Sequence, residues 1–260
     1  MIDTITSLQN PQVKAWRSLN KGRSQRLAQG LFLAEGEHMA QEAVKEQKAR
    51  ALLIDAAARE KYNALACAAQ GVSIYYLSSH VMETICDAKT PQGIIAVCSY
   101  PDENNTALDG DLLVALDGVQ DPGNVGTILR TMDAAGFHTL LMDEKTADPY
   151  SPKALRASMG GVFRIPSRRV ANLADTLKTL SQQGYQIIAG DLHGHPFFHR
   201  PSAGKKACII IGNEGAGISP PVLDAATMRL KLPMVGGAES LNAAVAGAIM
   251  MYDILRERMD

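Results

Sequence analysis

The stretch IIIGNEGAGIS at residues 209–219 runs from an apolar strand directly into a glycine-rich loop. A continuous apolar run is typical of a parallel strand that is covered on both faces. The glycines let the loop backbone approach a ligand closely or adopt positive φ. Their spacing is not that of a dinucleotide fingerprint, and the carboxylate of Glu214 would repel a pyrophosphate. The loop is electrostatically compatible with a cationic ligand such as a sulfonium.

A second loop with ligand-binding chemistry lies in DGVQDPGNVGTILR at residues 117–130, where a strand ends and a turn starts a helix. Such a helix start offers free backbone N–H groups and the positive end of the helix dipole, which suit an anion. Arg130 lies nearly two turns into this helix, on a face that is reachable from the same end. The alternative is a helix capped by Asn124 that carries an ordinary surface arginine.

A third loop occurs in LKLPMVGGAESLNAAVA at residues 230–246, where a short strand ends in proline and a Gly-Gly turn follows. We expect the next helix over residues 239–256, with Ser240 and Asn242 in its first turn, where they can cap the helix or hold a ligand. The helix has an apolar stripe that predicts a core contact or a subunit interface. The stripe consists of Leu241, Val245, Ala248, Tyr252 and Leu255.

Apolar runs alternate with helix-like segments along the whole chain, which predicts an α/β fold. In the first half we expect short apolar runs at 31–33, 51–54, 72–77 and 93–97 to alternate with helix-like segments at 37–47 and 56–69. In the second half we expect strands at 112–116, 139–142, 162–165, 186–189 and 208–211, and helices at 124–135 and 173–182. The segment PDENNT at 101–106 interrupts this pattern with turn-forming and charged residues, as an exposed linker does. We therefore predict a small α/β domain at 1–100, a linker at 101–109 and a parallel-sheet domain at 110–260.

The composition excludes several classes of protein. No run approaches the roughly 18 apolar residues of a membrane helix, and residues 1–30 lack the apolar centre of a signal peptide, so we expect a cytoplasmic protein. The cysteines lack Cys-x-x-Cys spacing. The histidines of DLHGHPFFH at 191–199 have no partner at the spacing of a tetrahedral site, so we expect no metal.

The net charge of −1 does not by itself indicate a nucleic-acid partner, but the basic residues are unevenly distributed. The first thirty residues contain five basic side chains and a single acid, Asp3. The basic residues fall on a helix that we expect to start after Asn10-Pro11. This basic arm predicts RNA binding, and the alternative is a solvated helix face. The basic arm consists of Lys14, Arg17, Lys21, Arg23 and Arg26.

Taken in order along the chain, the three loops resemble the three motifs of the SpoU (TrmH) branch of the SPOUT RNA methyltransferases. The residues that carry the resemblance are Asn124 with Arg130, GNEG at 212–215, and LPM at 232–234 followed by SLN at 240–242. Agreement of three ordered motifs is far less probable by chance than agreement of one.

The N-terminal half resembles the substrate-binding module of the same family. The similar segments are NPQVK at 10–14, LFLAEGEH at 31–38 and TPQG at 90–93. The resemblance implies a smaller α/β RNA-binding domain followed by a parallel-sheet α/β domain with a deep trefoil knot. It also implies a homodimer in which the last helix packs at the interface and the partner subunit completes each active site.

By this resemblance the loops at 212–217, 232–236 and 240–243 hold S-adenosylmethionine, and the protein methylates a ribose 2'-hydroxyl of tRNA or rRNA. The implied cofactor-binding residues are Gly190, Leu192, Ile211, Gly212, Asn213, Glu214, Gly215, Leu232, Met234, Ser240, Leu241, Asn242 and Ala243. The implied catalytic residues are Arg130, Asn124, Glu214, Ser240 and Asn242. Arg130 activates the hydroxyl, and because its free pKa exceeds ~12, stabilisation of charge is an alternative to a role as base.

Three other functions are compatible with parts of this pattern. An enzyme of the same fold can methylate an RNA base instead of the ribose, and a protein can keep the fold as a non-catalytic RNA-binding module. A nucleotide-dependent oxidoreductase is the third alternative, which the loop spacing disfavours. The sequence does not specify which RNA or which nucleotide is modified.

Overall fold

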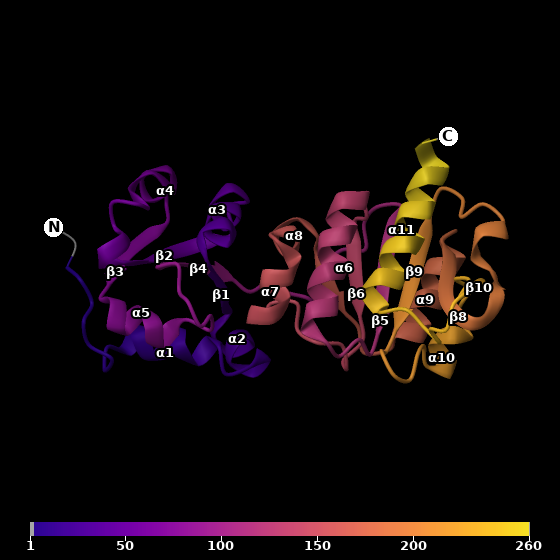
Figure 1. The fold of residues 1–260 in the computed structure, drawn as a ribbon, viewed down its shortest axis with the longest axis horizontal. Coiled ribbons are helices and arrows are strands. Elements are labelled where there is room, and N and C mark those ends of the chain that lie inside the picture. Colours follow the sequence, from indigo (N-terminus) through magenta and orange to yellow (C-terminus); the bar gives the residue numbers. More distant parts are fainter. Residues whose placement is uncertain (1–2, 260) are drawn as a thin grey trace. The chain divides into compact units, whose positions relative to one another are not determined.

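The structure is a computed structural model that describes residues 3–259. The chain forms two compact units (Figure 1). Unit 1 contains the residues up to Pro101 together with Asp148–Arg164, and unit 2 contains Asp102–Ala147 together with the residues from Ile165 onward. Within residues 3–259, no helix combines the length and the apolar character that a membrane crossing requires.

Unit 1 is built on a four-stranded mixed sheet in the order β1-β4-β2-β3. Its strands are β1 (Leu31–Glu35), β2 (Ala49–Asp55), β3 (Ser73–Leu77) and β4 (Ile94–Ser99). Strand β2 is parallel to β3, and β4 is antiparallel to both β1 and β2. The helices that precede residue 100 are α1 (Pro11–Leu19), α2 (Arg23–Gln29), α3 (Glu37–Lys45), α4 (Asn63–Ala68) and α5 (Ser79–Ile85).

The start of α1 follows the sequence prediction, because Asn10 accepts a hydrogen bond from the N–H of Gln12 and Pro11 is the first helical residue. The helix predicted over 56–69 is wrong in part. A 3-10 turn at Ala56–Ala58 is separated from α4 by an interruption. Tyr62 lies in this interruption, where its ring is buried and its hydroxyl donates to the Gln92 carbonyl. A tertiary contact thus overrides local helix propensity.

Residues 148–164 belong by packing to unit 1, although the sequence placed them in the second domain. They form α7 (Pro152–Ser158), which packs against β1, and α8 (Gly161–Arg164). The strand predicted at 162–165 is wrong, because these residues lie mostly in α8. The Phe32 ring of unit 1 lies 4.9 Å from the ring of Tyr150 and 6.2 Å from that of Phe163. Burial of these aromatic rings determines where the segment packs.

Unit 2 is built on a six-stranded parallel sheet in the order β10-β8-β9-β5-β6-β7, as the continuous apolar runs predicted. Its strands are β5 (Leu112–Asp117), β6 (Thr139–Met142), β7 (Ser167–Arg169), β8 (Gln186–Pro196), β9 (Ala207–Gly212) and β10 (Met228–Lys231). Its helices are α6 (Pro122–Ala135), α9 (Leu173–Gln182), α10 (Pro220–Leu223) and α11 (Ala243–Met259). The deep trefoil knot stays a prediction.

The order of the strands brings the three loops to one edge of the sheet. Strands β5 and β9 are neighbours, with Asp117 paired to Gly212, so the loops that follow them start side by side. Strand β8 flanks β9, β10 flanks β8, and α11 packs against both α6 and β9 (Figure 1). In open parallel sheets, ligands bind at the carboxyl ends of the strands.

The predicted linker is not uniformly exposed. Glu103 is buried, its backbone carbonyl accepts a hydrogen bond from the Arg169 N–H, and its carboxylate lies 3.5 Å from Arg169 Nε. Arg168 donates to the Thr106 carbonyl. The segment after Pro101 therefore lies along β7 as a fixed part of unit 2, because a buried carboxylate requires a charged partner.

Candidate active site

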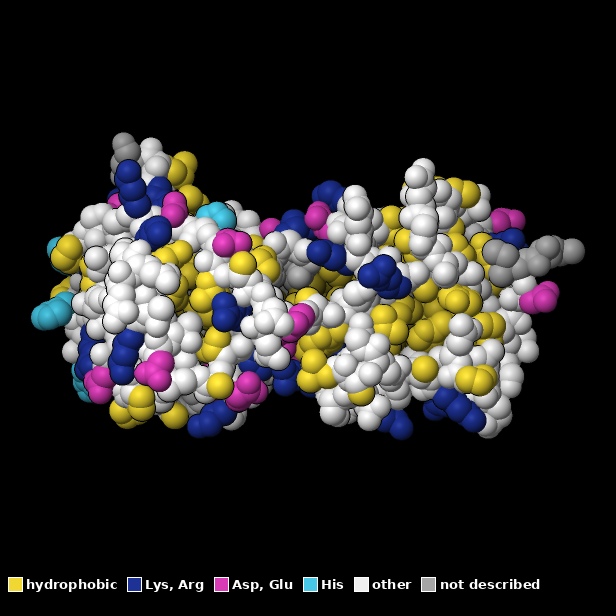
Figure 2. All heavy atoms as spheres, turned by 180° about the vertical axis from the view of Figure 1, so that it is seen from behind, with side chains coloured by type: hydrophobic (Ala, Val, Ile, Leu, Met, Phe, Trp, Pro, Cys, Tyr) yellow, Lys and Arg dark blue, Asp and Glu magenta, His cyan; other side chains and the backbone are white. Residues whose placement is uncertain are grey.

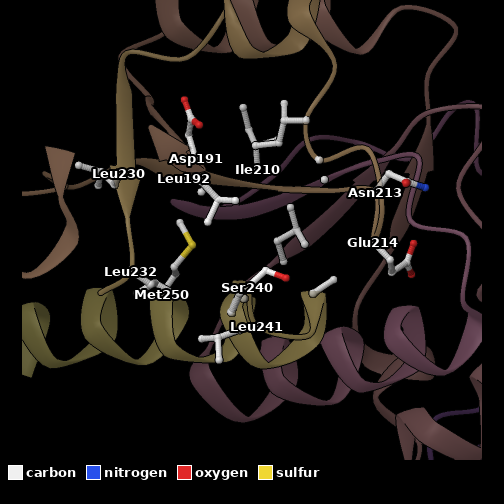
Figure 3. Close-up of a pocket in the computed structure, with 18 of the residues that line it drawn as sticks. Asp191, Leu192, Ile210, Asn213, Glu214, Leu230, Leu232, Ser240, Leu241 and Met250 are labelled. Carbon is white, nitrogen blue, oxygen red and sulfur yellow. The ribbon is translucent and has the colours of Figure 1, made fainter. Parts of the chain in front are cut away.

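A cavity of about 220 Å³ lies where the ends of β8, β9 and β10 face α11 (Figure 3). Leu192, Ser240 and Met250 point into the same space (Figure 3). All the residues predicted to bind a cofactor line this cavity, with the exception of Asn242. These lining residues are Gly190, Leu192, Ile211, Gly212, Asn213, Glu214, Gly215, Leu232, Met234, Ser240, Leu241 and Ala243.

Further lining residues were missed by the sequence prediction. They are Asp191, Ile210, Gly217, Ile218, Leu230, Ala246, Gly247 and Met250. Helical periodicity contained a signal for three of them, because residues 246, 247 and 250 share the face of Ala243. Strand alternation contained a signal for Leu230, which lies on the same side as Leu232.

Two glycines allow the close backbone approaches that shape the cavity. A Cβ atom on Gly212 would lie 2.4 Å from the Gly217 carbonyl carbon, so the loop after β9 can fold back on itself only with glycine there. A Cβ atom on Gly247 would lie 2.4 Å from Cδ1 of Ile211. Glycine at 247 thus lets α11 pack directly on β9.

A chain of side-chain hydrogen bonds joins the three loops. The amide of Asn242 donates to Oδ1 of Asn124 at 2.9 Å, and the amide of Asn124 donates to Oε1 of Glu214 at 2.9 Å. The Glu214 carboxylate also accepts the backbone N–H groups of Gln120 and Asp121 at 3.1 and 3.0 Å. Each loop is therefore fixed by a residue that the family resemblance had singled out.

Asn124 is not the cap of α6, so the capping alternative for this residue is wrong. Asp121 caps the helix by accepting the N–H of Gly123 at 2.7 Å, and Pro122 is the first helical residue. This leaves the side chain of Asn124, which is only 8% exposed, to connect the other two loops. Burial strengthens its hydrogen bonds, because water does not compete for them.

The last helix starts later than predicted, at Ala243 instead of residue 239. Asn242 precedes it and accepts the N–H groups of Ala244 and Val245 at Oδ1, which is the bonding of a helix cap. The same side chain donates to Asn124, so capping and loop attachment are combined in one residue. Ser240 lies on the exposed loop before the helix and lines the cavity.

The loop after β9 has further internal support from Asn213. Its Oδ1 accepts the N–H groups of Gly215 and Ala216, and its amide donates to the Gly118 carbonyl at 2.7 Å. Asp117, which the sequence prediction did not include, accepts the N–H of Ser219 at 2.6 Å. These bonds hold the loop after β9 against the loop after β5.

The pKa of Glu214 lies below its ordinary value. Partial burial alone would raise this pKa, but the hydrogen bonds from Asn124 and from the backbone amides of Gln120 and Asp121 outweigh the burial. Glu214 is therefore ionised at neutral pH, and both of its oxygens hold the loop after β5. Asp191 is a second acidic residue at the cavity.

Arg130 lies on the exposed face of α6. Among residues 3–259 no hydrogen bond or ion pair engages its guanidinium, which is available to a ligand or substrate. The structure thus separates two kinds of predicted catalytic residue. Asn124, Glu214 and Asn242 are bound to one another, whereas Arg130 is not engaged.

The basic arm is divided between the surface and the interior of unit 1. Lys14, Arg17 and Lys21 are exposed, and Arg23 is half-buried. Arg26, which was predicted to bind RNA, is only 4% exposed and forms an ion pair with Asp148 at 2.6 Å. A surface contact with RNA is therefore open to the first three residues but not to Arg26.

The part of the chain that the structure describes contains no group of three or more His, Cys, Asp or Glu side chains that could hold a metal ion. His193, His195 and His199 are exposed and lie along or just after the end of β8.

Comparison with known proteins identifies the family. The SpoU rRNA Methylase family matches residues 111–252, more than half of the chain, and the MRM3-like substrate binding domain matches residues 10–96. The chain belongs to the SpoU rRNA methylase family. The family match includes all three loops of the candidate site and continues through residues 148–164, which pack with unit 1.

Relatives of this family member match it over nearly their full length. The 23S rRNA (guanosine(2553)-2'-O)-methyltransferase RlmP of Bacillus subtilis is 36% identical over 96% of this chain and 98% of its own. The AdoMet-bound rRNA methyltransferase of Sinorhizobium meliloti has a TM-score of 0.85 and 32% identity, covering 98% of each chain. The SpoU methyltransferase AviRb of Streptomyces viridochromogenes, in complex with AdoMet, has a TM-score of 0.85 and 28% identity, covering 97% of this chain and 99% of its own.

The lowered pKa of Glu214 predicts how the joined loops respond to acid. Because the folded-state pKa is below the ordinary value of about 4.3, the stabilisation by this carboxylate is complete above that pH and is lost as the pH falls through the folded-state pKa. Glu214→Gln should weaken this stabilisation at neutral pH, since an amide has no negative charge and places its NH2 group against the N–H of either Gln120 or Asp121. We expect amide hydrogen exchange at these two residues to be faster by about tenfold or more in the variant at pH 7.

The matched control is Glu144→Gln, which changes an exposed acid in the loop after β6. After correction for intrinsic exchange rates, the wild-type protein should keep protection at Gln120 and Asp121 down to about pH 4. Equal protection in Glu214→Gln and in the wild-type protein at pH 7 would contradict the role assigned to this carboxylate.

Proposed function

We propose that this protein transfers a methyl group from S-adenosylmethionine to the 2'-hydroxyl of a ribose in RNA. The main support for the proposal is the position of Arg130. It lies on α6, whose start is bonded to the cavity loops, and its guanidinium forms no hydrogen bond or ion pair with residues 3–259. The named activity of the Bacillus relative and the AdoMet-bound structural neighbours support it. Ribosomal RNA is the first substrate to test, because the Bacillus relative acts on 23S rRNA.

The cavity fits the chemistry of this cofactor. Leu232, Leu241 and Met250 supply apolar contacts for a flat purine ring, while Asp191 and Ser240 supply polar groups. Glycines at the turns expose backbone N–H and carbonyl groups to a ligand. When bound, the cofactor supplies a methyl group on a positively charged sulfur.

Arg130 is the residue that we assign to the hydroxyl. A ribose hydroxyl is a weak nucleophile and develops negative charge at oxygen as it attacks. A guanidinium stays protonated at neutral pH, so it stabilises this charge by hydrogen bonds and does not have to accept a proton. Asn124 and Asn242 act as positioning residues, because their side chains are already bonded within the protein.

Replacement of Arg130 tests the proposal directly. We expect Arg130→Ala to slow methylation of RNA by about 100-fold or more, which is the usual effect of removing one charge-stabilising donor. Affinity for S-adenosylmethionine, measured by calorimetry, should stay within about threefold, because Arg130 does not line the cavity. Lys178→Ala is the control, since Lys178 is an exposed basic residue on α9.

The product distinguishes the proposal from its rivals. A 2'-O-methyl group blocks alkaline cleavage of the adjacent phosphodiester, whereas a methylated base leaves cleavage intact. Full cleavage of a methylated product would assign the enzyme to base methylation. Binding of RNA with no affinity for S-adenosylmethionine would favour a non-catalytic RNA-binding module.

The exposed residues of the basic arm are proposed to contact RNA phosphates. On the face seen in Figure 2, basic and acidic side chains are interspersed in each unit, so no general positive surface is seen there to attract RNA. Lys14 and Arg17 lie on α1, and Lys21 follows it. Alanine at all three positions should weaken RNA binding and lower the salt slope by about 0.7 to 0.9 per lost phosphate contact.

We propose that the active form is a homodimer that works in the cytoplasm. Val245, Tyr252 and Met259 recur at intervals of seven residues on one face of α11, and they are 48%, 50% and 79% exposed. Leu192 and Leu241 line the cavity yet are 48% and 37% exposed. A second copy packed on this face would bury Val245, Tyr252 and Met259 and cover the open side of the cavity.

A charge placed on this face of α11 tests the dimer. The wild-type protein should sediment at about twice the 27.9 kDa mass of one chain. Val245→Glu should sediment as a monomer, because a buried unpaired carboxylate is unfavourable. It should also bind S-adenosylmethionine more weakly, because the second copy no longer covers the open side of the cavity. Leu27→Glu, at a 47% exposed leucine of α2, is the control that should stay dimeric. A wild-type monomer would contradict the proposal.

A further inference from the structure

The cavity of the candidate active site carries side-chain charge of one sign. Its charged lining residues are Asp191 and Glu214, and within residues 3–259 no lysine, arginine or histidine lines it. The two acids come from different elements, the end of β8 and the loop after β9 (Figure 3). The lining of the cavity is therefore negatively charged at neutral pH.

Glu214 holds its charge in a fixed place. Its carboxylate accepts from the amide of Asn124 and from the N–H groups of Gln120 and Asp121. These bonds keep the pKa of Glu214 below its ordinary value. Because both oxygens are bonded within the protein, the charge of Glu214 acts on a ligand through its electric field.

Asp191 is the less engaged of the two carboxylates. Its Oδ1 accepts the N–H of His193 at 3.0 Å, and no lysine or arginine in the described part of the chain forms an ion pair with it. Asp191 is half-buried and lies between Gly190 and Leu192, which both line the cavity. Its negative charge is therefore not neutralised by an ion pair.

The dimensions and walls of the cavity let these charges act without direct contact. Ile211, Leu232, Leu241 and Met250 are apolar and screen charge less than water does. A cube with the cavity's volume of 220 Å³ has an edge of about 6 Å, which is shorter than the Debye length of ~8 Å. Over about 8 Å, attraction between unit charges changes an affinity about twofold in water and about thirtyfold at an effective dielectric constant of ~20.

The proposed reaction changes the charge of the ligand in this cavity. The bond between sulfur and the methyl carbon breaks and its electron pair stays on sulfur, while a lone pair of the ribose oxygen forms the new bond. The hydroxyl proton passes to solvent. The methyl donor has a net charge of about +1 at neutral pH, from a sulfonium, an ammonium and a carboxylate, whereas S-adenosylhomocysteine lacks the sulfonium charge and is neutral.

We propose that the cavity selects the methyl donor over the demethylated product by charge, and that Asp191 is a specificity-determining residue for this selection. The carboxylates of Asp191 and Glu214 attract the sulfonium, and the attraction ends when the sulfur becomes neutral. Loss of the methyl group thereby weakens retention of the product and lets new donor replace it. The proposal rests on the proposed function and adds cofactor exchange to it.

Asp191→Asn tests the proposal by calorimetry, without a methylation assay. The variant removes the charge but keeps an oxygen that accepts the N–H of His193. We expect the preference for S-adenosylmethionine over S-adenosylhomocysteine, measured as the ratio of their dissociation constants, to fall about threefold or more. Sinefungin, which has a protonated amine in the place of the methylsulfonium, should lose affinity as S-adenosylmethionine does.

The matched control is Asp111→Asn, which neutralises an exposed aspartate of the same unit. Asp111 directly precedes β5, so it lies at the opposite edge of the sheet from the loops of the cavity. The ratio of the two dissociation constants should stay at its wild-type value in this variant. A fall equal to that in Asp191→Asn would overturn the proposal.

The comparison of ligands separates charge selection from other roles of Asp191. Equal weakening of S-adenosylmethionine and S-adenosylhomocysteine in Asp191→Asn would assign the residue to a hydrogen bond with a group that both ligands share, and an unaltered affinity for both would leave it without a role. Either result would overturn the proposal. Absence of binding by both ligands to the wild-type protein would contradict the proposed function itself.

Salt provides a second measurement that needs no variant. When the salt concentration is raised from about 0.05 to about 0.5 M, the wild-type protein should lose more affinity for S-adenosylmethionine than for S-adenosylhomocysteine, because salt screens the attraction of the carboxylates for the sulfonium. Equal loss for the two ligands would overturn the proposal, even if Asp191→Asn does not fold.

Discussion

The candidate active site depends on the two hydrogen bonds that the side-chain amide of Asn124 forms. It donates to Glu214 and accepts from Asn242, so one buried group joins loops that follow different strands of the sheet. A buried amide that loses either partner would leave an unsatisfied polar group, which costs about 1–3 kcal/mol. The geometry of the cavity therefore depends on all three loops being in place together.

This arrangement divides the polar residues of the site by task. Asn124 is bonded to both Glu214 and Asn242, so these side chains hold the loops of the protein together. Arg130 lies two turns along the helix that these bonds fix, and its guanidinium remains available to a substrate. In the proposed function, this charge stabilises the negative charge that develops on the attacking oxygen.

Sequence patterns predicted the features that arise from local or periodic constraints. Continuous apolar runs identified the parallel sheet, Asn10-Pro11 identified the start of α1, and motif order identified most residues of the cavity wall. Features that depend on distant partners were missed. The burial of Arg26 follows from an ion pair with a residue 122 positions away, and no local pattern contains that information. The late start of α11 likewise depends on the choice of Asn242 as its cap.

A crystal structure of the protein with S-adenosylmethionine tests the central claim most directly. The claim predicts that the cofactor lies between Gly190–Leu192, the loop at 212–218 and the segment at 232–243, with the bonds from Asn124 to Glu214 and to Asn242 preserved. Cofactor density elsewhere, or a complex in which these three loops are separated and Asn124 has lost both partners, would contradict the account.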